Sequence, residues 1–313
     1  MTDKRTKLLE DSRGAWRAAR AHALTEALDL VAPKGWQPPS SSDLTSNFGF
    51  ALLNHTALRC LESAKRRDAV GIRQALTLLE EPNPGRPSGA CAVVDGQEVE
   101  WRTYSTFDSP VGVLTPGRTG ARPDDDPLLA DAATWLKLGD HADYVGSTLG
   151  VAVVLSRVGQ ADTTRSYSLQ GLPATAYCEL ASDSLRVAEV LLHESAHCWF
   201  NEQLLANQRT LEETPRWFSP WKDCQRPAFG ILHGALAFSG MCLLFAAALE
   251  SDRSSSFQRL YCQYRCRTEG LRLQAVEASA AEAARQLGRS ALREHVEGEL
   301  ARAIAATRRY CVQ

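Results

Sequence analysis

The residues most able to do chemistry lie in one short stretch, "LLHESAHCWF" at 191–200, which contains His-Glu-x-x-His. In a helix, His193 and His197 are four residues apart, so their rings project from the same face one turn apart. Two neutral imidazoles at this spacing can chelate one divalent metal ion. Glu194 is turned by about 100° from His193 at 3.6 residues per turn, so it lies beside the pair. The stretch therefore predicts the metal site of either a hydrolase or an oxygen-activating enzyme.

The residues around this motif predict that its helix is largely buried. The flanking side chains are apolar: Val190, Leu191, Leu192, Ala196, Trp199 and Phe200. Two imidazoles and a carboxylate on a buried helix require polar partners, because a buried polar group without one is costly. A bound metal ion would satisfy all three groups together.

A catalytic metal normally has three protein ligands and at least one open position, so a third ligand must come from elsewhere. The metzincin peptidase pattern would need Gly at 200 and His at 203, and Phe200 and Gln203 exclude it. The thermolysin-like pattern needs a Glu on a following helix. Glu212 and Glu213 are the nearest pair, but Thr214-Pro215 follows at once and disfavours a helix.

The remaining candidate for the third ligand is His233, inside the uncharged segment 228–249. A lone His on an apolar helix is commonly a core residue bonded to a carbonyl. Here Gly230 and Gly234 flank it, and small residues let another helix approach closely. We therefore expect His233 to face His193 and His197 across two helices.

A second motif follows the first by about thirty residues, in "SPWKDCQRPAFGILHGALAF" at 219–238. His-Glu-x-x-His, then Ser-Pro-Trp, then Arg-Pro-x-x-Gly-x-x-His-Gly, resembles a bacterial family of peptide-modifying proteins associated with ribosomally synthesised and post-translationally modified peptides. The family resembles iron(II)- and 2-oxoglutarate-dependent peptide β-hydroxylases. The resemblance covers residues 173–240 well, and the rest of the chain only in general layout.

The resemblance implies a role for each matching residue. His193, His197 and His233 would hold iron(II), and 2-oxoglutarate and dioxygen would take the three remaining positions of a six-coordinate ion. Arg226 would bind a carboxylate of 2-oxoglutarate, because a guanidinium offers that group two parallel hydrogen bonds. Lys222 stands where many relatives carry Arg. In this reading Glu194 orients a ligand histidine or the substrate, which is a precursor peptide.

Two other functions remain open at this point. In a zinc-dependent metallopeptidase, Glu194 would deprotonate a metal-bound water, and Arg226 or His233 would steady the oxyanion. In a non-enzymatic protein the metal would be structural, but the vacant coordination positions argue against that.

The sequence predicts a predominantly helical α+β fold, with a helical N-terminal region, a small central β-sheet and C-terminal helices that carry the metal site. We expect a helical region over 1–90 and an α+β core over 91–313, with a soft boundary between them or a single domain as the alternative. The expected helices cover 7–31, 44–64, 68–81, 127–138, 182–205, 228–249, 254–287 and 290–309. The expected strands cover 91–94, 98–105, 111–116, 150–158 and 175–180, and an irregular stretch is expected over 207–226.

Composition limits the partners. The 313 residues carry a formal net charge of -2, which favours neither nucleic acid nor an anionic membrane as a partner. The N-terminus is charged and has no apolar core segment, so we expect a cytoplasmic protein. Nine scattered cysteines without Cys-x-x-Cys favour reduced thiols. Segment 228–249 is long enough to span a bilayer, but we expect a central core helix. The oligomeric state is not predicted.

Overall fold

The computed structural model describes residues 4–40, 44, 46–80, 91–94, 97–104, 111–116, 127–159 and 163–311. Helices account for most of these residues, and the strands form one six-stranded and one two-stranded sheet. The predicted class, a predominantly helical α+β fold, is confirmed. The chain groups into two compact units. The sheet unit comprises residues 14–133 and 142–191, and the helical unit comprises 1–13, 134–141 and 192–313.

The sheet unit is built on a mixed sheet with the strand order β1-β2-β3-β4-β6-β5. Its strands are β1 (Cys91–Val94), β2 (Gln97–Tyr104), β3 (Val111–Pro116), β4 (Val151–Val158), β5 (Ser166–Leu169) and β6 (Leu172–Ala181). Strand β4 runs parallel to β3 and β6, and the other pairs are antiparallel. Strand β6 is buried along its whole length, as expected for a strand paired on both edges.

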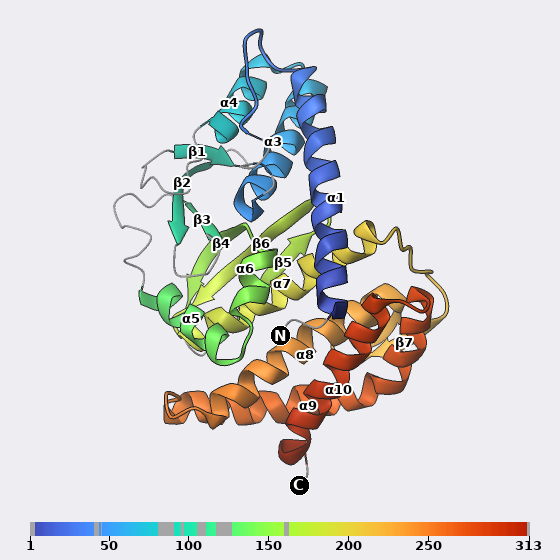
Figure 1. Ribbon diagram of the computed structural model, residues 1–313. Coiled ribbons are helices and arrows are strands. Elements are labelled where there is room, and N and C mark those ends of the chain that lie inside the picture. Colours follow the sequence, from blue (N-terminus) through green and yellow to red (C-terminus); the bar gives the residue numbers. More distant parts are fainter. Residues whose placement is uncertain are drawn as a thin grey trace. The chain divides into compact units, whose positions relative to one another are not determined.

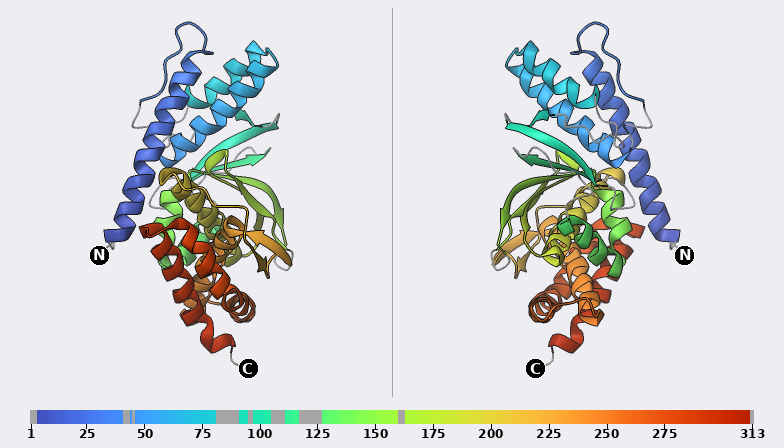
Figure 2. Two further views of the ribbon diagram at one scale, coloured as in Figure 1. Left: turned by 90° about the vertical axis from the view of Figure 1, so that its right-hand side faces the viewer. Right: turned by 90° about the vertical axis from the view of Figure 1, so that its left-hand side faces the viewer.

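Helices from the N-terminal region complete the sheet unit: α1 (Lys4–Asp29) from Gly14 onwards, α3 (Asn47–Lys65) and α4 (Ala69–Glu80). Helices α1 and α3 lie side by side in both views of Figure 2. Trp16 of α1 packs edge-on against Phe50 of α3 at a ring-centroid distance of 5.8 Å. Arg17 donates to the carbonyl of Thr148 at 3.1 Å, at the end of α6 (Ala142–Thr148). Apolar residues of α1, α3, α4, β4 and β6 form one buried cluster.

Helix α7 (Ser184–Ala206) carries the His-Glu-x-x-His motif, and its residues from Leu192 onwards belong to the helical unit. Its start is fixed by Asp183, whose Oδ1 accepts hydrogen bonds from the backbone N–H groups of Leu185 and Arg186 at 3.0 and 3.2 Å. This is the arrangement of a helix N-cap. It confirms the cap predicted within residues 182–184. The apolar flanks of the motif are all buried, as predicted.

The helical unit also contains α8 (Ala228–Glu250), α9 (Ser256–Ala284), the short 3-10 helix η2 (Arg285–Leu287) and α10 (Ala291–Cys311). Both α9 and α10 pack against α8 (Figure 1). Helices α9 and α10 also pack on each other, and they meet closely at Gly270. A Cβ atom at that position would lie 2.7 Å from Thr307 Oγ1. A side chain there would force the two helices apart.

Among the described helices, α8 alone is long and apolar enough to cross a membrane. Within its most apolar window, 67% of the residues are buried in the structure. A helix that is apolar on all sides and covered by other helices is typical of a core. The burial favours the interpretation of α8 as a core helix.

The structure adds elements that the sequence did not predict. These are α6, β5 and two short strands, β7 (Arg216–Ser219) and β8 (Cys224–Pro227), within the stretch expected to be irregular. The expectation of an irregular 207–226 is therefore wrong for its second half, because two four-residue strands give too short a pattern to detect. The expected break at 81–90, and with it the division at 90, lies outside the described residues and stays a prediction.

Candidate metal centre

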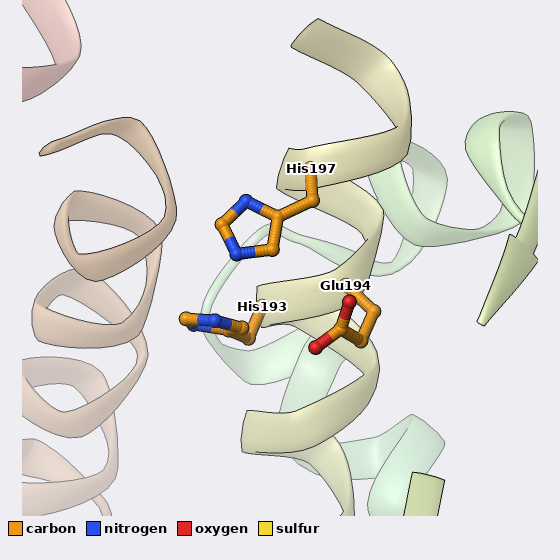
Figure 3. A group of neighbouring side chains, drawn as sticks. All are labelled: His193, Glu194 and His197. Carbon is orange, nitrogen blue, oxygen red and sulfur yellow. The ribbon is translucent and has the colours of Figure 1, made fainter. Parts of the chain in front are cut away.

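The two histidines of α7 lie as the helix periodicity predicts. Figure 3 shows both rings projecting from the same side of the helix, with the Glu194 carboxylate on an adjacent side. The ring centroids of His193 and His197 are 4.4 Å apart, and the two ring planes are nearly perpendicular, at 78°. One ligand atom from each of His193, Glu194 and His197 lies within 4.8 Å of the others. Both rings are partly accessible, whereas Glu194 is only 1% exposed.

One nitrogen of His193 has a partner on α8. Its Nδ1 lies 3.1 Å from Sδ of Met241. A thioether sulfur is a weak acceptor, so the proton sits on Nδ1 and Nε2 keeps its lone pair. Phe238, also on α8, packs edge-on against the same ring at 5.2 Å. These two contacts fix the ring and leave Nε2 as the nitrogen that can bind an ion.

His233 of α8 lies beside His197, as expected for a third ligand. The two rings are parallel within 6°, with centroids 3.6 Å apart. On its other face His233 stacks on Phe229, at 4.7 Å. Because stacked imidazoles direct their in-plane lone pairs side by side, His233 is not part of the compact group of ligand atoms formed by the α7 residues. Its role as third ligand stays a prediction, and it requires the ring to leave the stack.

Two ring nitrogens in this cluster are buried without a hydrogen-bond partner: His197 Nδ1 and His233 Nε2. Buried polar atoms nearly always have partners, so each such exception calls for an explanation. Neutral imidazole nitrogens are preferred ligands of zinc and iron. The group of His193, Glu194 and His197 therefore fits a divalent metal ion of this kind, and His233 would join it once its ring leaves the stack.

The histidines are neutral at physiological pH, as metal ligands must be. Burial, followed by the charges of Arg265 and Lys222, lowers the pKa of His193 to about 4. Burial, followed by His193 and Arg226, lowers the pKa of His233 to about 3. The pKa of His197 is well below its usual value, chiefly because of burial. All three rings thus offer lone pairs without first losing a proton.

Strands β7 and β8 pair in antiparallel fashion and form a hairpin whose connecting residues contain Trp221 and Lys222. The Trp221 ring stacks on Phe238 at 4.7 Å and 4°. Its indole N–H donates to Oε2 of Glu269 on α9 at 2.9 Å. Glu269 is buried and also accepts from Arg272 at 3.1 Å. A buried carboxylate therefore fixes Trp221, which covers the ring that packs on His193.

Gly230 and Gly234 do not admit another helix, contrary to the expectation from the sequence. A Cβ atom on Gly230 would lie 2.7 Å from Nε of Arg226, and one on Gly234 would lie 3.2 Å from the ring of Trp221. Two side chains of the hairpin occupy the space instead. The small residues do mark a close approach, but its partner is a pair of large side chains.

Arg226, the predicted carboxylate-binding residue, lies against Gly230, one turn before His233 on α8. Its side chain is partly buried. No hydrogen bond or ion pair of this guanidinium is found in the described part of the chain. A partly buried guanidinium in this state is suited to an external anion.

Every charged side chain that shifts the pKa of the three histidines, apart from the histidines themselves, is a cation: Arg265, Lys222 or Arg226. Arg265 has a carboxylate near it, since its guanidinium lies 3.5 Å from Glu269. Lys222 is exposed, and like Arg226 it has no ion pair among the described residues. The motif Ser-Pro-Trp-Lys marks the position of Lys222, but the sequence assigned it no role.

The rejected ligand candidates lie outside any helix, as predicted. Glu212 and Glu213 are exposed and belong to the segment that precedes β7. The backbone N–H of Glu212 donates to Gln286.

All eight cysteines whose side chains are described are free thiols.

No protein-family model matches this chain, and no curated protein is similar to it. The residues of the site are therefore the basis for assigning a function.

Proposed function

We propose that this protein is an iron(II)- and 2-oxoglutarate-dependent oxygenase that hydroxylates a side-chain β-carbon of a ribosomally synthesised precursor peptide. The peptide and the β-carbon rest on the resemblance of the two sequence motifs. The metal and the keto acid are supported by geometry. The carrying observation is Arg226, a partly buried cation that has no hydrogen-bond or ion-pair partner among the described residues and lies against Gly230, one turn from His233 on α8.

The cations around the histidines favour a metal that arrives with an anionic ligand. A divalent ion placed among Lys222, Arg226 and Arg265 is repelled by like charges. A chelating dianion removes this repulsion, because one carboxylate binds the ion and the other binds a cation of the protein. A water-activating zinc site has no such requirement. This charge pattern favours the oxygenase over the hydrolase.

Bound iron(II) would supply the activation of dioxygen, in which 2-oxoglutarate becomes succinate and CO2 while one oxygen atom enters a substrate C–H bond. His193, His197 and His233 would hold the ion, and Arg226 would hold the distal carboxylate of the co-substrate. Phe238 packs on His193, Phe229 packs on His233 and Trp221 covers Phe238, and these rings would exclude water from the reacting carbon. Met241 fixes the tautomer of His193.

A zinc-dependent metallopeptidase is the second candidate, and one observation favours it. A ligand atom of Glu194 lies within 4.8 Å of those of both α7 histidines. A carboxylate at that distance is close enough to take a proton from a metal-bound water. In the oxygenase, Glu194 is an outer-shell acceptor instead.

The proposal also covers the location and the partners of the protein. We propose a cytoplasmic protein that acts on a peptide and uses neither a membrane nor a nucleic acid. The near-neutral net charge of -2 and the burial of α8 support this assignment.

The decisive experiment adds iron(II) and 2-oxoglutarate to the metal-free protein without oxygen. We expect a weak visible charge-transfer band from the chelated keto acid. The variant Arg226→Gln should need at least about tenfold more 2-oxoglutarate for half the band, since a bidentate ion pair is lost. Arg289→Gln, at an exposed position between η2 and α10, is the matched control. A protein that shows no band, but cleaves peptides when loaded with zinc, is a peptidase.

A further inference from the structure

We propose that Lys222 binds a carboxylate of the substrate, so that the site selects peptides with an acidic side chain at or next to the reacting residue. The inference deepens the proposed function, because it names a feature of the peptide substrate. It rests on where the hairpin places the Lys222 backbone and on the lack of an ion pair for Lys222 among the described residues.

The position of Lys222 follows from the contacts of the preceding residue, Trp221. The Trp221 ring lies on the bare backbone of Gly234 and stacks on Phe238. Phe238 in turn lies 5.2 Å from His193. Because Trp221 is also bonded to a buried carboxylate, the chain at residue 222 is held beside the turn of α8 that follows His233. Lys222 is exposed there, within reach of an arriving ligand.

The ammonium group of Lys222 is available for an external partner. Lys222 directly follows Trp221, whose ring lies on Gly234 and stacks on Phe238, the ring that packs on His193. Asp223 is next in the chain and also exposed, but no ion pair joins the two in the described part of the chain. The nearby Glu269 already accepts hydrogen bonds from Trp221 and Arg272.

Charge balance indicates what the partner is. The two positive charges of iron(II) are matched by the two carboxylates of 2-oxoglutarate. Arg226 would be paired with the distal carboxylate of 2-oxoglutarate, whereas Lys222 has no ion pair among the described residues. A carboxylate of the substrate would supply that partner. An acidic side chain is therefore the complement of this site.

The roles of Lys222 and Arg226 are separate. Arg226 lies against Gly230, before His233 on α8. Lys222 follows Trp221, whose ring lies on Gly234, after His233. The hairpin thus holds the two cations against different positions of α8. One can bind the co-substrate while the other binds the peptide.

The test uses a displayed library of random peptides, so the natural substrate need not be known. The full-length protein is loaded with cobalt(II) and 2-oxoglutarate without oxygen, and bound peptides are sequenced. We expect Asp and Glu to be enriched about fivefold at one position, the size of effect that a partly solvated ion pair gives. Lys222→Gln should lose this enrichment, and Lys222→Glu should enrich Lys and Arg instead. Lys137→Gln, at an exposed position on α5 (Pro127–Leu138), is the matched control.

The outcomes separate this inference from the proposed function. Equal Asp and Glu enrichment in the wild type and Lys222→Gln overturns the inference, as does the absence of any enrichment in the wild type. If Lys222→Gln needs tenfold more 2-oxoglutarate to reach half of the charge-transfer band, the inference is also overturned, because Lys222 would then hold the co-substrate. If no charge-transfer band forms in any variant while acidic selection still follows Lys222, the oxygenase fails and the acidic substrate remains.

Discussion

Helix α7 carries two sets of polar side chains, and they differ in where their partners are. In the first set, the Trp199 indole donates to Glu10 at 3.0 Å and the Gln203 amide donates to the carbonyl of Leu9 at 3.1 Å. Glu202 lies 3.7 Å from the Arg13 guanidinium. The second set, His193 and His197, lies on the preceding turns of the same helix.

The first set is satisfied within the protein, whereas the second is not. Arg13, Glu202 and Gln203 are all buried. Arg13 and Glu202 form an ion pair, and Gln203 donates to a backbone carbonyl. His197 Nδ1 and its neighbour His233 Nε2 are buried without one. The comparison shows that buried polar groups on one helix can have two different roles. Closed networks stabilise the fold, and open ones bind a ligand.

The largest expected effect comes from removing an open nitrogen. His197→Leu should lower the affinity for cobalt(II) by more than about 100-fold, which exceeds the cost of losing an outer-shell partner. The metal-free variant should unfold at the same urea concentration or a higher one, because the lost nitrogen has no partner. Calorimetric titration and urea unfolding measure the two quantities.

His295→Leu is the control for this change. The His295 ring packs at 4.7 Å from Trp199, so it belongs to the closed region. Its replacement should leave cobalt binding unchanged. If His197→Leu kept its affinity for cobalt, the metal centre would be wrong.

The next effect concerns the closed set. Arg13→Ala removes the guanidinium that lies 3.7 Å from the buried carboxylate of Glu202, and we expect a loss of about 3 kcal/mol in the free energy of unfolding. Cobalt affinity should stay within about twofold of the wild type. The double variant Arg13→Met/Glu202→Met should recover most of the loss, since apolar replacement of both partners leaves no buried charge. A single variant as stable as the wild type would contradict the structural role of this pair.

A smaller effect is expected from His141, a buried histidine outside both sets. Burial, then the charge of Arg302, lowers its pKa to about 4, with Asp140 acting in the opposite direction. Between this pKa and the ordinary histidine pKa of 6.5, the unfolded chain binds more protons than the folded one, so stability falls as the pH drops. The loss begins below pH 6.5 and reaches about 2 kcal/mol at pH 5.

His141→Phe should remove this part of the pH dependence. Urea unfolding at pH 7.5 and pH 5 measures it, with the exposed His22→Gln as control. An unchanged difference between the two pH values in His141→Phe would show that another group carries it.

The smallest effect sharpens the boundary between the sets. Met241→Leu removes the sulfur beside His193 Nδ1 but keeps the side-chain volume. We expect cobalt affinity to fall by about tenfold, the lower end for an outer-shell partner, because a thioether accepts weakly. A loss above 100-fold would mean that Met241 has a more direct part in the site.

The sequence predicted the elements that carry strong periodicity. Helices α7 and α8, and the relation of His193 to His197, follow from helical spacing and from the apolar flanks. The start of α7 followed from the cap at Asp183. These features are local, so a single chain contains the information.

The remainder depends on contacts between distant segments. Nothing in the residues around His233 shows that its ring stacks on His197, because that contact joins two helices. The glycines at 230 and 234 indicated a close approach, but not that Arg226 and Trp221 make it. The bond between Trp221 and Glu269 joins positions 48 residues apart. Such pairings are set by packing and leave no period in the sequence.

The two glycines of α8 on either side of His233 have a consequence for recognising homologues of this protein. Apolar core positions can drift among Leu, Ile, Val and Met at little cost. An alanine at Gly230 or Gly234 would instead displace a guanidinium or an indole. A distant homologue with the same arrangement should therefore keep the spacing Gly-x-x-His-Gly even where every neighbouring letter has changed. That five-residue signature, placed downstream of His-Glu-x-x-His, is a sharper search pattern than overall identity.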